Sequence, residues 1–303
     1  MEAAVHSSSN KPKRMHKFKQ LITPYLFVLP NIIIFSVFIV IPAILGFYYS
    51  LHKYDGLNPM KFIGLDNYKS ILSNSQFWEV LKNTFLYAGT AVPLLFICSL
   101  GIALLLAQQI RFKGLFRAVY YWPVMISFII VGLTWKWIFG SSFGILNYIL
   151  GGLGLPEIGW LTDPFWAKVS VVAATLWSRI GFYMVIFIAG LHSIPTDFYE
   201  AARIDGASRS RIFFKITLPL LKPTSLLVLI LTVIDAFKQY PLMYALTSGG
   251  PGKATTYMVQ YIYEIGFEKT ELGLASAMSV VLFAIIGTFA FVQFKLSKGG
   301  AYD

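Results

Sequence analysis

The stretch SIPTDFYEAARIDGASRSRIFFKITLPLLKP, residues 193–223, is a polar segment between two long apolar runs. A connection longer than about 12–15 residues is usually functional or disordered. Pro195 suits a first helical turn, and Asp197 and Glu200 follow where the helix dipole favours negative charge. The pattern therefore predicts a short helix at this point of the chain.

The second half of the same segment predicts another helix. Gly206 is expected to end the first helix, because glycine readily adopts the backbone conformation found at helix ends. Asp205 is expected to cap a second helix through residues 212–216, which Pro219 and Pro223 then stop. The segment predicts a helix-turn-helix that lies across a membrane face.

The rest of the chain has the composition of a membrane protein. Of its 303 residues 56% are apolar and 13% are charged, against roughly 25% charged residues in a soluble domain. A membrane-crossing helix needs roughly 20 apolar residues. The sequence thus predicts an all-α integral membrane protein with six transmembrane helices, at residues 25–50, 84–107, 118–139, 167–190, 224–246 and 272–294.

The distribution of positive charge predicts how these helices are oriented. The side that holds both termini and the 192–223 loop carries 15 Lys and Arg residues, the other side carries 9, and Arg179 lies within a span. By the positive-inside rule the first side is cytoplasmic. The chain then divides into a basic cytoplasmic arm (1–24), a transmembrane domain (25–296) and a cytoplasmic tail (297–303).

The net charge of +11 follows from the same distribution. The basic residues track membrane topology and do not form the continuous face that a phosphate backbone would require. Nucleic acid is therefore not an expected partner, whereas membrane lipid is. The single Cys98 lies in an apolar run and allows no internal disulfide.

The 193–223 segment also resembles a known signature. Glu200-Ala201-Ala202, Gly206, Ile216 and Leu218-Pro219 match, without a gap, the cytoplasmic loop of permease subunits in bacterial ABC importers. FIGLDNY (62–68) and LTSGGPGKATTYMVQYIY (246–263) are similar to the sugar-type, maltose-transporter-like branch of that family. The resemblance covers nearly the whole chain from residue 25 to 296.

This resemblance implies the type I ABC importer permease fold and a transport function. The subunit would form the path for a carbohydrate, either a mono- or oligosaccharide or a related polyol, which an external binding protein delivers. The implied partners are a second homologous permease subunit, two ATPase subunits and the extracytoplasmic substrate-binding protein. The complex would lie in the bacterial inner (cytoplasmic) membrane. The chain would not itself be an enzyme, because ATP hydrolysis would take place on the separate ATPase subunit.

The alternative is a stand-alone secondary transporter driven by an ion gradient. Proteins of that class usually contain internal repeats with broken helices in corresponding positions, and the sequence shows no second copy of the 193–223 pattern. A membrane-embedded enzyme would need clustered catalytic residues inside the spans, and Arg179 and Asp235 alone do not form such a cluster. No catalytic residue is assigned.

The resemblance makes the 193–223 segment the coupling helix that docks into the ATPase. Small residues let a helix approach a foreign surface closely, Glu200 offers a carboxylate to a partner arginine, and aromatic side chains supply anchors. The predicted coupling residues are Phe198, Tyr199, Glu200, Ala201, Ala202, Asp205 and Gly206. The other interpretation is a helix that lies on anionic lipid through Arg203, Arg209, Arg211 and Lys215. This lipid-binding interpretation explains neither the Ala201-Ala202 pair nor Gly206.

Charged residues within the fourth and fifth spans are candidates for the substrate path. A charge at a helix centre costs roughly 2.5–3.5 kcal/mol on insertion, so Arg179, Asp235 and Lys238 are expected to face protein or water. Asp235 and Lys238 are three residues apart and could pair with each other. Two interpretations stay open for these side chains, a translocation path or gate and a structural ion pair between neighbouring helices.

Aromatic residues make up 17% of the chain and gather mainly at predicted span ends, as an aromatic belt does. A carbohydrate path would also use rings that offer an apolar face and a polar edge. The aromatic candidates for substrate contact are Trp177, Phe237 and Tyr240.

Nucleotide and metal sites are not expected. GGPGKAT (249–255) resembles part of a phosphate loop, but Thr247 and Ala254 replace residues that such a loop needs, and the predicted topology places it outside the cell. The four histidines are scattered over the arm and loops and form no metal-binding pattern. No cofactor is expected.

Overall fold

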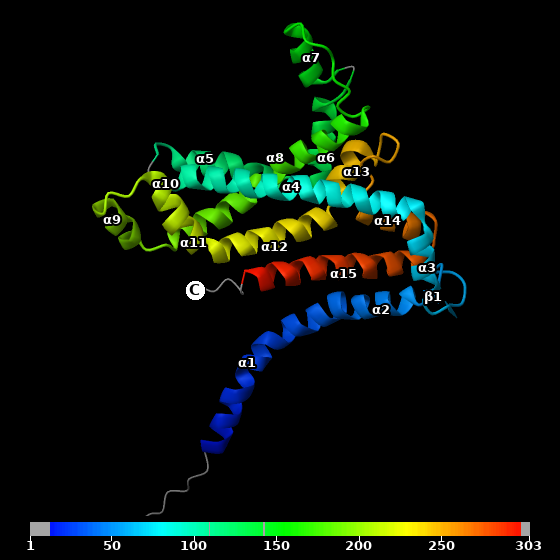
Figure 1. Ribbon diagram of the computed structural model, residues 1–303. Coiled ribbons are helices and arrows are strands. Elements are labelled where there is room, and N and C mark those ends of the chain that lie inside the picture. The colour runs from blue at the N-terminus through cyan, green and yellow to red at the C-terminus, as the bar shows by residue number, and fades with distance from the viewer. Residues whose placement is uncertain (1–12, 109, 142, 298–303) are drawn as a thin grey trace, which may run out of the picture.

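The structure is a computed structural model that describes residues 13–108, 110–141 and 143–297 (Figure 1). Residues 1–12 of the predicted arm and 298–303 of the predicted tail lie outside the described residues. The described chain is almost wholly helical. It contains one two-stranded antiparallel ribbon, β1 (His52–Lys53) and β2 (Lys61–Phe62), with His52 opposite Phe62. The predicted all-α membrane fold is confirmed.

The helical elements follow one another with few long gaps. In chain order they are α1 (Lys13–Phe35), η1 (Ser36–Val40), α2 (Ile41–Ser50), α3 (Asp66–Ser73), α4 (Ser75–Ala107), α5 (Lys113–Tyr121), η2 (Trp122–Met125), α6 (Phe128–Ile138), α7 (Ile145–Gly152), α8 (Pro164–His192), α9 (Thr196–Ile204), α10 (Arg209–Ile212), η3 (Phe213–Thr217), α11 (Leu218–Leu220), α12 (Lys222–Lys238), α13 (Pro241–Thr247), α14 (Met258–Tyr263), η4 (Glu264–Glu268) and α15 (Leu272–Leu296).

Four described helices are long and apolar enough to cross a membrane: Pro24–Ser50, Ser75–Ala107, Pro164–His192 and Leu272–Leu296. Two bent pairs raise the number to six if each pair counts as one span. The first, fourth and sixth predicted spans agree with these helices to within a few residues. The helix that contains the first span begins earlier, at Lys13, and runs on through Pro24 and Pro30.

The second span is longer than its apolar run predicts. Helix α4 begins at Ser75, where the Asn74 side chain accepts hydrogen bonds from the backbone N–H groups of Gln76 and Phe77. Its 33 residues give a length of about 50 Å, more than the roughly 30 Å of a bilayer core. The predicted span began only at residue 84, because polar residues interrupt the apolar pattern before that point. One of these polar residues, Asn83, is nevertheless buried in the structure, where its side chain donates to the Lys253 carbonyl.

The third predicted span is broken. Helices α5 and α6 meet at an angle of 101° around the η2 turn, where Pro123 occupies the first turn and Ile126 has an extended backbone. This elbow packs on Gly181 of α8. A Cβ at Gly181 would lie 2.8 Å from the Tyr121 Cα, so only glycine allows this approach. The continuous helix over 118–139 was a wrong prediction, because the backbone leaves the helical region at Ile126 and Ser127, after the Pro123 turn.

The fifth predicted span, 224–246, is broken as well. Helix α12 ends at Lys238, Gln239 is extended, and α13 starts with Pro241 in its first turn. A residue before proline avoids helical geometry, which explains the break. At its other end α12 continues the α10–α11 segment through a bend of 67°.

Figure 1 shows that α9 and α10 lie at one end of the bundle, with the C-terminal end of α15. The β ribbon and α3 lie at the opposite end, and these two ends are called the α9 end and the β1 end below. Helix α4 packs along α8, while α12 and α15 lie beside them. Helix α1 departs from the bundle, and the most apolar window of Pro24–Ser50 is 0% buried within the chain.

Candidate functional site

Helix α9 forms where the sequence predicts it and ends as predicted at Gly206. Pro195 is its N-cap residue, and Gly206 adopts a φ of +72°. The Ala207 N–H donates to the Ala202 carbonyl at 2.9 Å and the Gly206 N–H donates to the Arg203 carbonyl at 3.1 Å. This pair of bonds is a Schellman motif, which satisfies the last carbonyls of the helix and needs a left-handed residue.

The second helix of the segment differs from its prediction. Asp205 ends α9 and does not cap α10; the Ser208 side chain does so, because its hydroxyl accepts from the Arg211 N–H. The helix does not stop at Pro219 or Pro223 either. Each proline occupies a first turn, Pro219 in α11 and Pro223 in α12, where the missing N–H costs nothing.

The two faces of α9 have different surroundings. Ile204 is 87% exposed and lies on the outward face of α9 with Glu200 and Ala201, while Phe198, which is 50% exposed, lies one turn before Ala202 at the edge between the two faces. The opposite face carries Tyr199 and Ala202: Ala202 is buried, and the Tyr199 hydroxyl lies 3.3 Å from the Thr217 hydroxyl. Tyr199 therefore contacts the bundle in this chain and is not an exposed anchor.

An ion pair joins two membrane helices at the charges that the sequence singled out. Arg179 of α8 lies 3.2 Å from the Asp235 carboxylate of α12. The Tyr183 hydroxyl donates to the same carboxylate at 2.6 Å, and the Arg179 guanidinium lies over the Phe128 ring of α6 at 4.4 Å. Three elements thus meet around one neutralised pair, whose side chains are 21% and 37% exposed in this chain.

Lys238 does not join this pair. Its side chain is exposed, and within the described residues it forms no ion pair with Asp235. The suggested Asp235–Lys238 pairing is therefore wrong for this structure. The reason is that α8 brings a guanidinium to the carboxylate, and the Tyr183 hydroxyl donates to the same carboxylate oxygen, Oδ2.

The family of the chain follows from its sequence. Residues 84–297 match the family of inner membrane components of binding-protein-dependent transport systems. This match runs from within α4 to the end of α15, including α9 and both members of the ion pair. The chain belongs to this permease family.

Relatives match the permease over nearly its whole length. A trehalose/maltose transport system permease protein of Thermococcus litoralis is 36% identical over 283 residues, 93% of this chain and 96% of that protein. An sn-glycerol-3-phosphate transport system permease protein of Agrobacterium fabrum is 36% identical over 286 residues, 92% of this chain and 95% of that protein.

A solved structure shares the fold. A bacterial alginate ABC transporter, in complex with an alginate pentasaccharide-bound periplasmic protein, aligns with a TM-score of 0.82 at 24% identity, over 94% of this chain and 97% of that chain. The predicted ABC importer permease fold is confirmed, and with it the function of a permease subunit.

The three aromatic candidates of the permease lie in different surroundings. Trp177 is 41% exposed and packs edge to face against Trp135, with 5.9 Å between the ring centroids. Phe237 is 3% exposed and packs in one cluster with Phe85 and Phe289, so in this conformation it is a core residue. Tyr240 follows the C-terminal end of α12 and stacks on Tyr263, with 5.6 Å between the ring centroids. Of the three, Trp177 is the one that neighbours Arg179 on α8.

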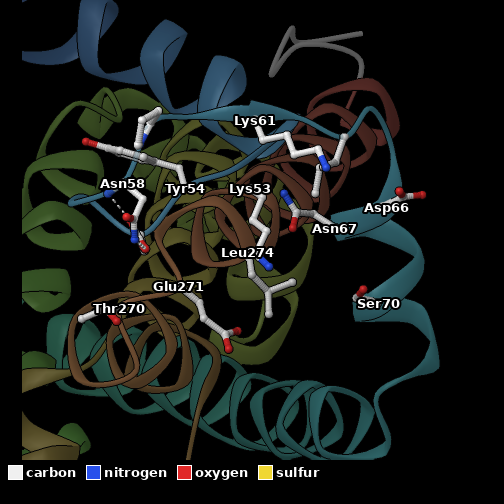
Figure 2. A pocket seen from close by; sticks show the side chains of 13 residues that line it. Lys53, Tyr54, Asn58, Lys61, Asp66, Asn67, Ser70, Thr270, Glu271 and Leu274 are labelled. Carbon is white, nitrogen blue, oxygen red and sulfur yellow. Dashed lines mark hydrogen bonds between the residues drawn. The ribbon is translucent and has the colours of Figure 1, made fainter.

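A polar pocket of about 530 Å³ lies at the β1 end of the permease (Figure 2). Lys53 of β1 and Glu271 at the start of α15 reach it from separate elements, together with Lys61. Asp55 accepts from the backbone N–H of Asn58 at 2.8 Å, from the Asn58 side chain at 2.6 Å and from the Leu57 N–H at 2.9 Å. These bonds lower the pKa of the Asp55 carboxyl to about 2.

Two further motifs of the sequence have structural roles. Asn67 of the FIGLDNY motif is buried and donates to the carbonyls of Ser50 and His52, which holds α3 against the end of α2. In the GGPGKAT loop the Thr255 hydroxyl donates to the Gly250 carbonyl at 2.7 Å and its oxygen lies 2.7 Å from the Thr247 hydroxyl oxygen, so the loop uses its polar groups internally. In the part of the chain that the structure describes, no three His, Cys, Asp or Glu side chains come together as a metal site.

Sequence reasoning missed several of the functional neighbours. Ile204 was not singled out, although its place one turn after Ala201 puts it on the outward face of α9. Tyr183 and Phe128 around the ion pair were missed as well. Tyr183 had a signal, because it lies one helical turn after Arg179 on the same face of α8, whereas Phe128 lies on a distant segment and had none.

Proposed function

We propose that this permease subunit forms the translocation path for a neutral carbohydrate in an ABC importer. The observation that carries the proposal is the Arg179–Asp235 pair. It places hydrogen-bonding groups midway along α8 and in the last turn of α12 without adding net charge. Ionisable residues inside spans generally mark substrate paths or gates, and a paired arginine and carboxylate suit hydroxyl groups better than an acidic substrate.

The names of the relatives support a sugar as the transported substrate. The relatives include a trehalose/maltose permease and a probable permease for starch degradation products. The sn-glycerol-3-phosphate permease is a relative at similar identity and carries an acidic substrate by its name. The neutral ion pair favours the sugar, because a phosphate ester would have to compete with Asp235 for Arg179.

The orientation follows from charge. The α9 end is cytoplasmic in this proposal, because its side of the membrane carries the larger number of Lys and Arg residues. The outward face of α9, with Glu200, Ala201 and Ile204 and with Phe198 at its edge, then points toward an ATPase subunit. The β1 end, with its polar pocket, faces the external binding protein.

A second permease subunit explains the exposed first span. The apolar segment Pro24–Ser50 has almost no cover within the chain, so it must lie against lipid or another membrane protein. With two ATPase subunits on the two α9 helices, closure of the ATPase dimer on ATP would draw these helices together. The spans would then open the path outward, and hydrolysis would reset it.

ATP-dependent uptake tests the proposal. The complex of both permeases and the ATPase is reconstituted in vesicles with the binding protein added outside, and uptake of radiolabelled maltose, trehalose and glycerol phosphate is measured. We expect uptake of a neutral sugar. This uptake should require ATP enclosed in the vesicles and should persist when the ion gradients are collapsed. Uptake by the subunit alone, driven by an ion gradient, would instead identify a secondary transporter, an alternative for which the relatives give no support.

A further inference from the structure

A second cavity, of about 820 Å³, lies between α9 and the ends of α4 and α8. Its polar lining includes Arg203 of α9, Arg209 of α10 and His192 at the end of α8. Figure 1 shows these elements gathered at the α9 end of the bundle. The cavity is therefore bounded on one side by the coupling segment and on the other by the helices that it must move.

The charged groups that line the cavity are cationic. No carboxylate lines it among the described residues, and neither Arg203 nor Arg209 forms an ion pair there. The acidic residues of α9, Asp197, Glu200 and Asp205, are exposed but do not line the cavity. Two free guanidinium groups in one pocket repel each other, so an anion would stabilise the arrangement.

A third arginine extends the positive charge behind the cavity wall. The Arg117 Nη2 atom lies 3.5 Å from the His192 Nε2 atom and donates to the Leu106 carbonyl at 3.0 Å. The Nε–H of Arg117 is buried and has no hydrogen-bond partner among the described residues. The wall formed by His192 is thus backed by a cation that has a free donor.

The rest of the lining has an apolar part, besides the polar side chains of Gln108, Thr196, Tyr199 and Thr217. Leu104 and Leu191 lie near the ends of spans α4 and α8, and Ile212 and Phe213 face them from the α10–η3 segment. A ligand that fits this lining has an anionic group and an apolar part. A soluble phosphate ester would leave the apolar wall without a partner, whereas a phospholipid would satisfy both walls.

We propose that this cavity binds the phosphate headgroup of an anionic phospholipid, held by Arg203 and Arg209. Basic pockets between membrane helices on the cytoplasmic side bind such headgroups, and the inference rests on the proposed cytoplasmic orientation of the α9 end. The lipid bridges α9 and α10 to the ends of α4 and α8. It thereby stiffens the segment through which the ATPase moves the spans.

The test uses the purified complex in detergent and native mass spectrometry to count bound lipid. Phosphatidylglycerol is titrated against phosphatidylcholine. The double variant Arg203→Gln with Arg209→Gln should bind phosphatidylglycerol roughly thirtyfold more weakly, the loss expected for two cationic side chains next to an anionic headgroup. The matched control, Arg211→Gln with Lys215→Gln, removes the same charge from neighbouring exposed positions that do not line the cavity. It should bind within twofold of the unmodified complex.

Three results would overturn the inference. An equal loss in the control would mean general attraction to a basic surface. Displacement of the lipid by millimolar inorganic phosphate or glycerol phosphate would identify a soluble anion as the ligand. Unchanged binding by the double variant would remove the cavity as the site. Subunit stoichiometry in the same spectra checks that each variant is assembled, and because no sugar is present the result is independent of the proposed substrate.

Discussion

At the scale of single residues, the central observation is the choice of partner for Asp235. The carboxylate had two candidate cations at similar depth, and the structure pairs it with Arg179 while Tyr183 donates a second hydrogen bond. Breaking such a pair leaves one charge without its partner in a poorly solvated place. The pair is therefore the residue-scale feature whose change should have the clearest effect.

Replacing Asp235 by Asn tests the role of the pair. The variant should assemble, because Tyr183 can still donate to the amide oxygen, but the unpaired guanidinium should disturb sugar binding. We expect the sugar concentration at half-maximal uptake to rise about tenfold, equivalent to about 1.4 kcal/mol. An acidic sugar such as glucuronate should be taken up better than by the unmodified complex, since Arg179 is then free to bind a carboxylate.

The control is Lys238→Gln, which removes a charge from the same end of α12 without touching the pair. It should stay within twofold of the unmodified complex in both measurements. A lower yield of assembled Asp235→Asn complex, with a normal half-saturating concentration per assembled complex, would show that the pair is structural and does not belong to the path.

At the scale of elements, α9 has one face that packs on the bundle and one face that the chain leaves uncovered. The inward face is held by the Tyr199–Thr217 contact and by buried Ala202, and the Schellman motif at Gly206 sets where the helix ends. The outward face leaves Ile204 uncovered beside Glu200, with Phe198 half-exposed at its edge. An isolated nine-residue helix is marginal in water, so tertiary contacts must hold it in place.

Substitutions on the two faces of α9 should therefore have different effects. Glu200→Lys should reduce the amount of ATPase that co-purifies with the permease by roughly thirtyfold, the effect of losing an interface residue worth about 2 kcal/mol. Tyr199→Phe removes one hydroxyl on the inward face and should leave co-purification unchanged. A full complement of ATPase with Glu200→Lys, at unchanged transport, would contradict the docking assignment.

At the scale of the whole molecule, the bundle has two chemically different ends. The α9 end collects most of the arginines, while the β1 end carries the β ribbon, the mixed-charge pocket and the GGPGKAT loop. The two broken spans concentrate at the α6–α13 contact, where Gly132 lets the helices meet: a Cβ at this position would lie 2.6 Å from the Leu242 carbonyl oxygen. The described fold thus combines two broken spans with four long helices that are not broken in this way.

Reporter fusions test the orientation of this bundle. A fusion after Gly252 should be extracytoplasmic and active as alkaline phosphatase, and a fusion after Ser208 should be cytoplasmic and inactive. The reason is the 15 to 9 split of Lys and Arg between the two sides. A cytoplasmic location for both fusions would reject the arrangement with six spans.

The sequence by itself determined the features that depend on local composition and spacing. Apolar runs predicted where the straight spans Pro164–His192 and Leu272–Leu296 lie, and Gly206 predicted the end of α9, because chain length in the bilayer and backbone conformation are local properties. The spacing of the 193–223 residues predicted the family for the same reason.

Only the tertiary structure decided which distant groups meet. Asp235 pairs with Arg179 on another helix, Phe237 is buried in one cluster with Phe85 and Phe289, and the α5–α6 elbow bends against Gly181. None of these contacts has a local signal, because each depends on the relative placement of helices that are far apart in the chain. Packing between helices, and not the periodicity within each helix, selects the partner of a buried charge.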